Sequence, residues 1–366
     1  MTLIAAIGLP NQEIAFVADS IATTTYPAAF TIGRTTQGEH LQPIVVRDQV
    51  RGFVEGACKI GAFGNTICAA AGNSALIYEL LERLDNTLAN WTDLEAADAS
   101  LNRAQIEPVG ESLLGTDATL IFAFRTGSGQ MFCTVGISVM PDQSLRFQKS
   151  CKASTPGETW VGYFGSGADL LGQYYPSCIG AYESDRTLRD LLPSMLAMDL
   201  SAKVRTEQMN NAAGVGGTFV SVFLGEDTLL RSTDVVHIHA NAQKEIQFFS
   251  KVIFRRGTFF VNDVIGRRGF AMRSLEEEVA YRLGNRPGTQ DVTPEVIELL
   301  QYRARGVFLD VRSADAPNTP DVSIVENING DAIPGMANLP LGSYPLPGST
   351  LQFSCQGETV DLTVRA

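Results

Sequence analysis

The chain has 366 residues, and its composition of 45% hydrophobic and 19% charged residues supplies enough material for a full globular core. The net charge of −12 argues against nucleic acid or an anionic membrane as a partner, because phosphate groups are bound by clustered Lys and Arg. No basic residue precedes the first apolar stretch, and Pro10 interrupts it, so we expect neither a signal peptide nor a membrane span. The six cysteines lack CxxC spacing, which is typical of reduced thiols, and we expect a cytoplasmic protein.

The first part of the chain is predicted to form short strands. Apolar runs at 2–8 and 13–18 flank turn residues, and so do the runs at 59–63 and 66–71, so each pair predicts a β-hairpin. The mixed segment 23–52 between the pairs predicts either a long loop or an inserted hairpin.

Helical periodicity begins after the second of these hairpins. Leucines recur at helical spacing up to Leu88, and Asn73 or Ser74 is a suitable N-cap for the helix that they predict. A second helix is predicted over 93–112, with its cap at Thr92 or Asp93.

The remaining elements are predicted in blocks of strands and blocks of helices. In chain order they are strands at 118–125, 130–138, 144–150 and 159–164, helices from about Ala168 and over 186–205, strands at 218–224 and 229–239, β-like sequence at 246–263, helices at 273–284 and 293–304, and a hairpin at 350–365. Such blocks favour antiparallel sheets covered by helices over a parallel doubly wound sheet. We therefore predict an α+β fold: a four-layer αββα sandwich over 1–244, followed by a C-terminal extension or small mixed α/β domain over 245–366.

Six short motifs follow one another along the first two thirds of the chain. They are Thr2, Ala18-Asp19-Ser20, Lys59-Ile60, Ala71-Gly72, Gly165-Ser166-Gly167 and Gly216-Gly217. Each alone is unspecific, but in this order and strand–helix context they resemble the β-subunits of the 20S proteasome and their bacterial relatives, including HslV. These are N-terminal-nucleophile (Ntn) hydrolases, and the resemblance implies their fold, a threonine nucleophile and a ring of identical subunits.

The chemistry expected of Thr2 follows from its place in the chain. An N-terminal threonine carries a hydroxyl nucleophile and an α-amine on one residue, and an amine with a pKa of about 8 is partly unprotonated near neutral pH and can act as base. Thr2 qualifies only after removal of Met1, and a small second residue such as Thr is accepted by methionine aminopeptidase. Taken alone, Thr2 is an ordinary second residue; the other five motifs make it the expected nucleophile.

Asp19 and Lys59 are expected to form a buried pair. Each is a charged residue at the end of an apolar strand, and a buried charge needs a partner. The two would satisfy each other if the first and third strands are neighbours, and a Lys ammonium near Thr2 would favour an unprotonated amine. The alternative is that Asp19 caps a turn and Lys59 is a solvated strand end.

Two further positions are matched to the family. The amide of Gly72 precedes a predicted helix and is a candidate oxyanion donor, with a plain tight turn as the alternative. Ser166 matches the serine beside the nucleophile that helps to shuttle the proton, and it could also serve as a helix N-cap.

The sequence also departs from the family pattern. An Asp and a Ser that the family carries before its late Gly-Gly are missing ahead of Gly216, where Asn211 could replace only part of the hydrogen bonding. Ile21 stands where the family usually has Arg, and the segment from Asp19 to Lys59 is about 24 residues longer than in typical members. These departures make activity a weaker expectation than the fold.

No cofactor or metal is expected. The sequence has no phosphate-binding loop and no dinucleotide fingerprint. His237 and His239 alternate on one predicted strand and share a face, but no third ligand has metal-site spacing, so structural or solvated histidines are favoured.

The sequence therefore predicts a threonine hydrolase, in the first place a peptidase, that acts on a peptide or amide substrate. The resemblance implies a homo-oligomeric ring, and neither the substrate nor an unfoldase or other regulator can be assigned. Two alternatives stay open: a small-molecule amidohydrolase of the same fold, and a catalytically silent structural or binding subunit.

Overall fold

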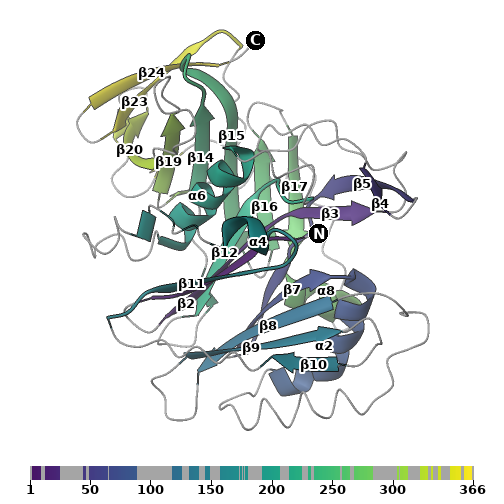
Figure 1. The fold of residues 1–366 in the computed structure, drawn as a ribbon. Coiled ribbons are helices and arrows are strands. Elements are labelled where there is room, and N and C mark those ends of the chain that lie inside the picture. The colour runs from purple at the N-terminus through teal and green to yellow at the C-terminus, as the bar shows by residue number, and fades with distance from the viewer. Residues whose placement is uncertain are drawn as a thin grey trace.

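The computed structural model describes the following residues: 2–9, 13–24, 44–46, 49–64, 66–88, 118–125, 132–139, 145–148, 157–172, 174, 176, 178–179, 192–206, 214–224, 230–231, 235–255, 258–263, 268–282, 303–304, 306–311, 322–328, 331–332, 337–338, 347–355 and 358–364. Mainly antiparallel sheets, with two parallel pairings in the C-terminal sheet, and helices that pack on their faces make up this part of the chain (Figure 1), which agrees with the expected α+β class. The helix predicted over 93–112 lies outside the described residues.

The first five-stranded sheet combines strands from the start of the chain with strands from 219–231. Its order is β11–β1–β2–β12–β13, with bounds β1 Ile4–Gly8, β2 Ile14–Asp19, β11 Trp160–Phe164, β12 Phe219–Leu224 and β13 Leu230–Arg231. β1 and β2 pair as the predicted hairpin, with Ile4 opposite Ala18. Every residue of β1, β2 and β12 is buried, in agreement with their largely apolar sequences, which Asp19 and Ser221 interrupt.

The second five-stranded sheet is a meander of neighbouring strands. Its order is β10–β9–β8–β7–β6, with bounds β6 Ile60–Phe63, β7 Thr66–Gly72, β8 Ala118–Arg125, β9 Phe132–Val139 and β10 Leu145–Gln148. β6 and β7 form the second predicted hairpin, in which Gly64 has a φ of 60° at the turn.

Alternate residues of the second sheet belong to two different hydrophobic clusters. On β7 and β8, Ile67, Ala69, Ile121 and Ala123 join the cluster that contains the residues of the first sheet. Their neighbours along each strand join a second cluster, which helix residues complete; the neighbours are Cys68, Ala70, Leu120, Phe122 and Phe124. The sheet therefore contacts the first sheet on one face and helices on the other, as the period of two along a strand requires.

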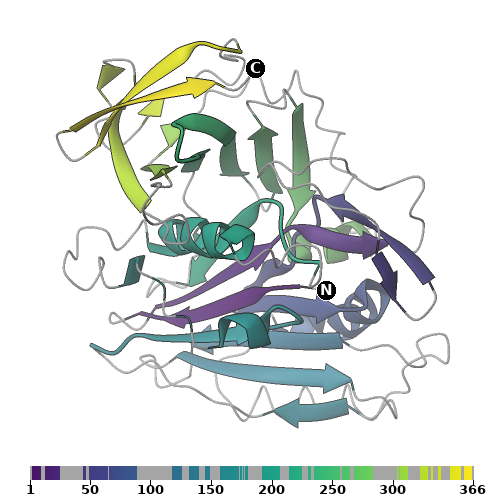
Figure 2. The same cartoon turned by 45° about the horizontal axis from the view of Figure 1, so that its top comes forward.

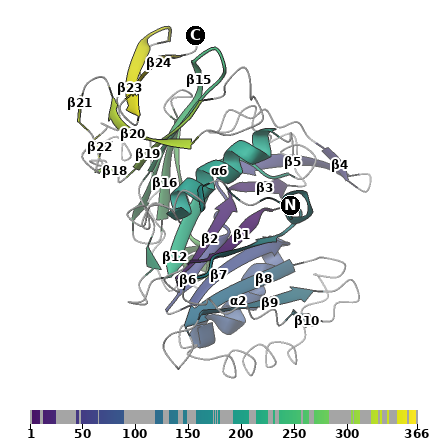
Figure 3. The same cartoon turned by 60° about the vertical axis from the view of Figure 1, so that its left-hand side comes forward.

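Helices flank both sheets. The second cluster holds α2 (Ser74–Leu88), whose N-cap Asn73 accepts hydrogen bonds from the backbone N–H groups of residues 75 and 76, as well as α8 (Leu275–Arg282). The first sheet is contacted by α4 (Ala168–Leu171) at β11 and by α6 (Leu192–Thr206) at β2 and β12. α6 also contacts β19 (Gly306–Val311) and β20 (Val322–Ile328) of a third sheet, and Figure 3 shows α6 between the first sheet and the third.

The extra length between Asp19 and Lys59 contains a small sheet of its own. Its strands are β3 Ile21–Thr24, β4 Ile44–Val46 and β5 Gln49–Glu55, in the order β3–β5–β4. β4 and β5 pair antiparallel, which agrees with the inserted-hairpin alternative. Figure 2 shows this sheet on the same side of the molecule as the N-terminus.

The C-terminal part of the chain forms a nine-stranded sheet whose pairings close on themselves. Its strands are β14 Val235–Ala240, β15 Glu245–Arg255, β16 Thr258–Asp263, β17 Arg268–Arg273, β19 Gly306–Val311, β20 Val322–Ile328, β21 Asp331–Ala332, β23 Thr350–Cys355 and β24 Glu358–Val364. The path β14–β19–β20–β23–β24–β15 returns to β14 through the β14–β15 pairing. The predicted hairpin at 350–365 is confirmed as β23 and β24.

Two predictions for this part of the chain are wrong. The strand predicted at 229–239 is two strands in different sheets, β13 and β14, because β13 pairs with β12 while β14 pairs with β15 and β19. The last two residues of the helix predicted at 293–304 are not helical: they form β18 (Arg303–Ala304), which pairs with β22 (Ala337–Asn338). In both cases long-range pairing overrode a local pattern.

No helix among the described residues is long and apolar enough to cross a membrane.

Candidate active site

Thr2 lies at the start of β1 and is held through its backbone by the Gly165-Ser166-Gly167 turn. Its backbone nitrogen donates to Ser166 Oγ at 2.9 Å, and its carbonyl oxygen accepts from the N–H of Gly167 at 3.2 Å. Gly165 has a φ of 88°, and a Cβ at this position would overlap the carbonyl oxygen of Thr2. Glycine is required here, because only glycine allows both this conformation and this approach.

Ser166 faces Thr2 and does not cap α4. The N-cap of α4 is Gly167, which has no side chain to accept a hydrogen bond, so the capping alternative for Ser166 is wrong. Ser166 Oγ instead lies within hydrogen-bonding distance of both the nitrogen and the carbonyl oxygen of Thr2. A hydroxyl can accept from one group and donate to another, so Ser166 can relay a proton at this position.

Asp19 is fully buried at the end of β2 and its carboxylate accepts four hydrogen bonds. Oδ1 accepts from the Leu3 N–H at 2.9 Å and from Lys59 Nζ at 2.6 Å. Oδ2 accepts from two further backbone N–H groups, those of Ile21 at 3.3 Å and Gly216 at 3.2 Å. Such a set of donors stabilises the ionised carboxylate without solvent.

Lys59 reaches Asp19 from the other sheet. It immediately precedes β6, and its side chain is 9% exposed. We expected this pair to form if the first and third strands were neighbours, but these strands, β1 and β6, belong to different sheets. The contact between Lys59 and Asp19 forms instead where the two sheets face each other. The solvated-end alternative for Lys59 is therefore wrong.

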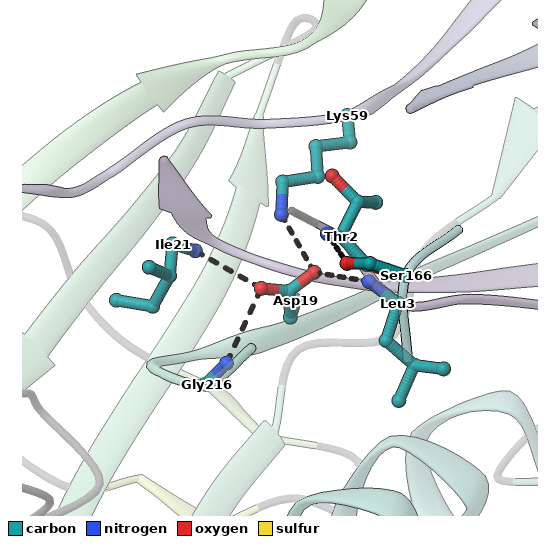
Figure 4. Close-up of polar contacts among 7 residues, drawn as sticks. All are labelled: Thr2, Leu3, Asp19, Ile21, Lys59, Ser166 and Gly216. Atoms are coloured by element: carbon teal, nitrogen blue, oxygen red, sulfur yellow. Dashed lines mark hydrogen bonds and ion pairs between the residues drawn. The ribbon is translucent and has the colours of Figure 1, made fainter. Parts of the chain in front are cut away.

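The electrostatics of Lys59 combine two opposing effects. Burial lowers the pKa of the Lys59 ammonium below its ordinary value, and the Asp19 carboxylate opposes that shift. The neighbouring thiol of Cys58 has a pKa raised to about 12 by burial, so it stays protonated and is no rival nucleophile. Figure 4 shows Ser166 joined to Thr2, and the Asp19 carboxylate joined to Lys59 and to the backbone of Leu3, the residue after Thr2.

Gly72, His237 and His239 are among the described residues. Gly72 ends β7 with a φ of 112° and directly precedes the cap of α2. His237 and His239 are buried on β14, where His239 stacks on Phe248 with ring centroids 5.4 Å apart. The described residues contain no group of three or more His, Cys, Asp or Glu that could hold a metal ion. Asn211 lies outside the described residues.

Two carboxylates near the site were not predicted from the sequence. Glu55 Oε1 accepts from the N–H of Thr218 at 2.9 Å, next to the Gly216 that donates to Asp19. Glu276, on α8 of the C-terminal region, accepts from the N–H of Ala62 at 2.9 Å, three residues beyond Lys59. Neither contact could be predicted from the local sequence, because each joins segments more than 150 residues apart.

Of the comparisons with known proteins, the one with solved structures finds similar chains. No protein-family model matches the chain, and no curated protein matches its sequence. Among solved structures, the chain is similar to the eukaryotic HslV from Trypanosoma brucei, with a TM-score of 0.29 and 11% sequence identity. The alignment covers 61% of this chain and 98% of the HslV chain.

Proposed function

We propose that this protein is an N-terminal threonine hydrolase that cleaves amide bonds, in the first place those of peptides. The observation that carries the proposal is the buried ion pair of Lys59 and Asp19 beside Thr2, 2.6 Å between Nζ and Oδ1. Burying two charges costs desolvation free energy, so a buried pair at this place calls for a reason. The pair lies next to Thr2, the residue that removal of Met1 would turn into both nucleophile and base.

In the proposed reaction, the free α-amine of Thr2 takes the proton of the Thr2 hydroxyl, with Ser166 Oγ as the relay. The oxygen attacks the amide carbonyl, and the amide nitrogen leaves after it receives that proton. Thr2 then carries the acyl group as an ester, which water hydrolyses to restore the hydroxyl. The Lys59 ammonium favours the neutral amine and stabilises negative charge on the oxygen, and the Gly72 amide is the proposed oxyanion donor.

The finer architecture is part of this proposal. We assign residues 1–244 to a four-layer αββα unit with α2 outside one sheet and α4 and α6 outside the other, supported by the packing of the two clusters. Residues 245–366 are the C-terminal region, and α8 from that region contacts β6. A ring of identical subunits is the proposed assembly.

A catalytically silent subunit is the second candidate. It is favoured by the missing Asp and Ser ahead of Gly216. The first test is the N-terminus of protein made without a tag. The hydrolase requires a mass that corresponds to removal of Met1, because an acylated Thr2 nitrogen cannot act as base. Retention of Met1 would leave the silent subunit as the better account; a Thr2→Glu variant, whose large second residue should keep Met1, is the matched control.

A further inference from the structure

Glu55 connects the inserted three-stranded sheet to the loop that precedes β12. Its Oε1 accepts from both the N–H and the hydroxyl of Thr218, at 2.9 and 3.4 Å. Gly217, with a φ of 72°, passes so close that a Cβ there would lie 2.9 Å from Glu55 Oε1 and 2.7 Å from Ser20 Oγ. The loop is thus fitted between Glu55 and the residue that follows Asp19.

This loop also supplies one of the donors to Asp19. Gly216 N–H donates to Asp19 Oδ2 at 3.2 Å, and the Gly216 carbonyl accepts from the Ser20 N–H at 3.3 Å. Phe219, next to Thr218, lies opposite Asp19 in the β2–β12 pairing. A shift of Thr218 would therefore displace Gly216 N–H and Phe219, and with them the hydrogen bond to the Asp19 carboxylate.

Glu55 is also tied to Lys59 along the chain. It lies opposite Ile21 in the β3–β5 pairing, and the next two residues, Gly56 and Ala57, donate their N–H groups to the Ser20 carbonyl at 3.1 and 3.0 Å. Lys59 follows Glu55 by four positions in the chain. The Glu55 carboxylate thus binds the loop that donates to Asp19, while the backbone that follows Glu55 is held at Ser20 on its way to Lys59.

We propose that Glu55 is a positioning residue that holds Gly216 against Asp19 and thereby sets the orientation of the Asp19–Lys59 pair. Thr218 is fully buried, so its N–H needs an acceptor, and a buried donor that loses its acceptor moves or takes up water. The effect on catalysis rests on the proposed function, whereas the effect on the loop does not.

The test compares Glu55→Ala and Glu55→Asp with Glu55→Gln, which keeps an oxygen acceptor at the same reach. Backbone hydrogen exchange is measured on peptides covering 214–219, and the rate of covalent labelling of Thr2 by a peptide epoxyketone is measured across pH. We expect exchange to rise and labelling to fall by about tenfold or more in the Ala and Asp variants, as the loss of a hydrogen bond to a charged group implies. The Gln variant should restore both to within about threefold.

The outcomes separate the two proposals. Unchanged exchange at 214–219 in folded Glu55→Asp or Glu55→Ala protein overturns the positioning role. Faster exchange in these variants without any labelling of the wild type supports the positioning role and counts against the hydrolase. Labelling at the wild-type rate and pH profile in a variant whose loop exchanges faster also overturns the inference, because the loop would then have no effect on the pair.

Discussion

Lys59 Nζ lies 2.6 Å from Asp19 Oδ1, although the two residues are 40 positions apart and Lys59 immediately precedes a strand of the other sheet. The carboxylate that receives this ammonium also accepts the N–H of Leu3, the residue next to Thr2. Asp19 Oδ1 therefore holds both the Lys59 ammonium and the backbone of the residue that follows Thr2.

Replacement of Lys59 by Met should abolish activity. The methionine side chain has a similar length but no charge, so the α-amine and the hydroxyl of Thr2 lose the nearby ammonium, and we expect a loss of about 100-fold or more in kcat/KM. Lys59→Arg should not rescue, because a guanidinium is planar, larger and always protonated. Turnover near the wild-type rate in the Met variant would remove Lys59 from the mechanism.

The stability of the same variant provides a separate test. Lys59→Met leaves the buried Asp19 charge with three backbone donors only, and breaking a buried ion pair costs about 3–5 kcal/mol. The double variant Asp19→Asn/Lys59→Met removes that charge and should recover part of the loss in urea unfolding while staying inactive. A double variant no more stable than Lys59→Met would mean that the Asp19–Lys59 pair contributes little to the free energy of unfolding.

Gly165→Ala should lower the free energy of unfolding by more than the left-handed backbone conformation of residue 165 alone would cost. Gly157 has a similar φ, 83°, but no atom lies within 4 Å of the place of its Cβ, so Gly157→Ala measures only the cost of the left-handed conformation, about 1 kcal/mol. The alanine at 165 would also overlap the Thr2 carbonyl, so its loss of unfolding free energy should be larger by about 1–3 kcal/mol. Equal losses in the two variants would contradict the close approach.

Glu276 should make stability depend on pH. Burial raises the pKa of its carboxyl to about 7 from the usual 4.5, so the folded protein holds a proton that the unfolded chain has lost. The free energy of unfolding should therefore fall as the pH rises from about 4.5 to about 7, and then level off. The contribution should be about 1–2 kcal/mol, reduced because Glu276 is only partly buried.

Glu276→Gln tests this pH dependence. The amide does not titrate, so urea unfolding at several pH values should give a flatter profile in this window than the wild type. Glu278→Gln, on the same helix and paired with Arg273 at the surface, is the matched control and should retain the wild-type slope. Parallel profiles in the wild type and Glu276→Gln would show that the buried carboxyl does not titrate in this range.

Much of the site could be predicted because its signals are local. Asp19 and Lys59 are charges at the ends of apolar strands, and such charges need partners wherever the fold places them. Ser166 lies in a Gly-Ser-Gly turn between a strand and a helix. The Gly-Ser-Gly turn alone is unspecific, and Ser166 could be predicted only because the six motifs follow one another in the order of the family that they resemble.

The contacts that could not be predicted depend on distant segments. Glu55 and Glu276 look like ordinary surface acids, because the Thr218 and Ala62 N–H groups that they accept from come from other parts of the fold. The split of residues 229–239 into β13 and β14 was missed for the same reason: which sheet a strand joins is decided by pairing partners that its own sequence does not identify.

The most direct test of the account is covalent labelling of Thr2. An N-terminal threonine that has lost Met1 offers both a hydroxyl and an amine to a peptide epoxyketone, and the account predicts a double adduct on Thr2, found by intact mass and peptide mapping. The adduct should be absent in Thr2→Ala and strongly reduced in Lys59→Met. A folded protein that begins at Thr2 and gives no adduct after long incubation with epoxyketones of several side chains would contradict the hydrolase and leave the silent subunit.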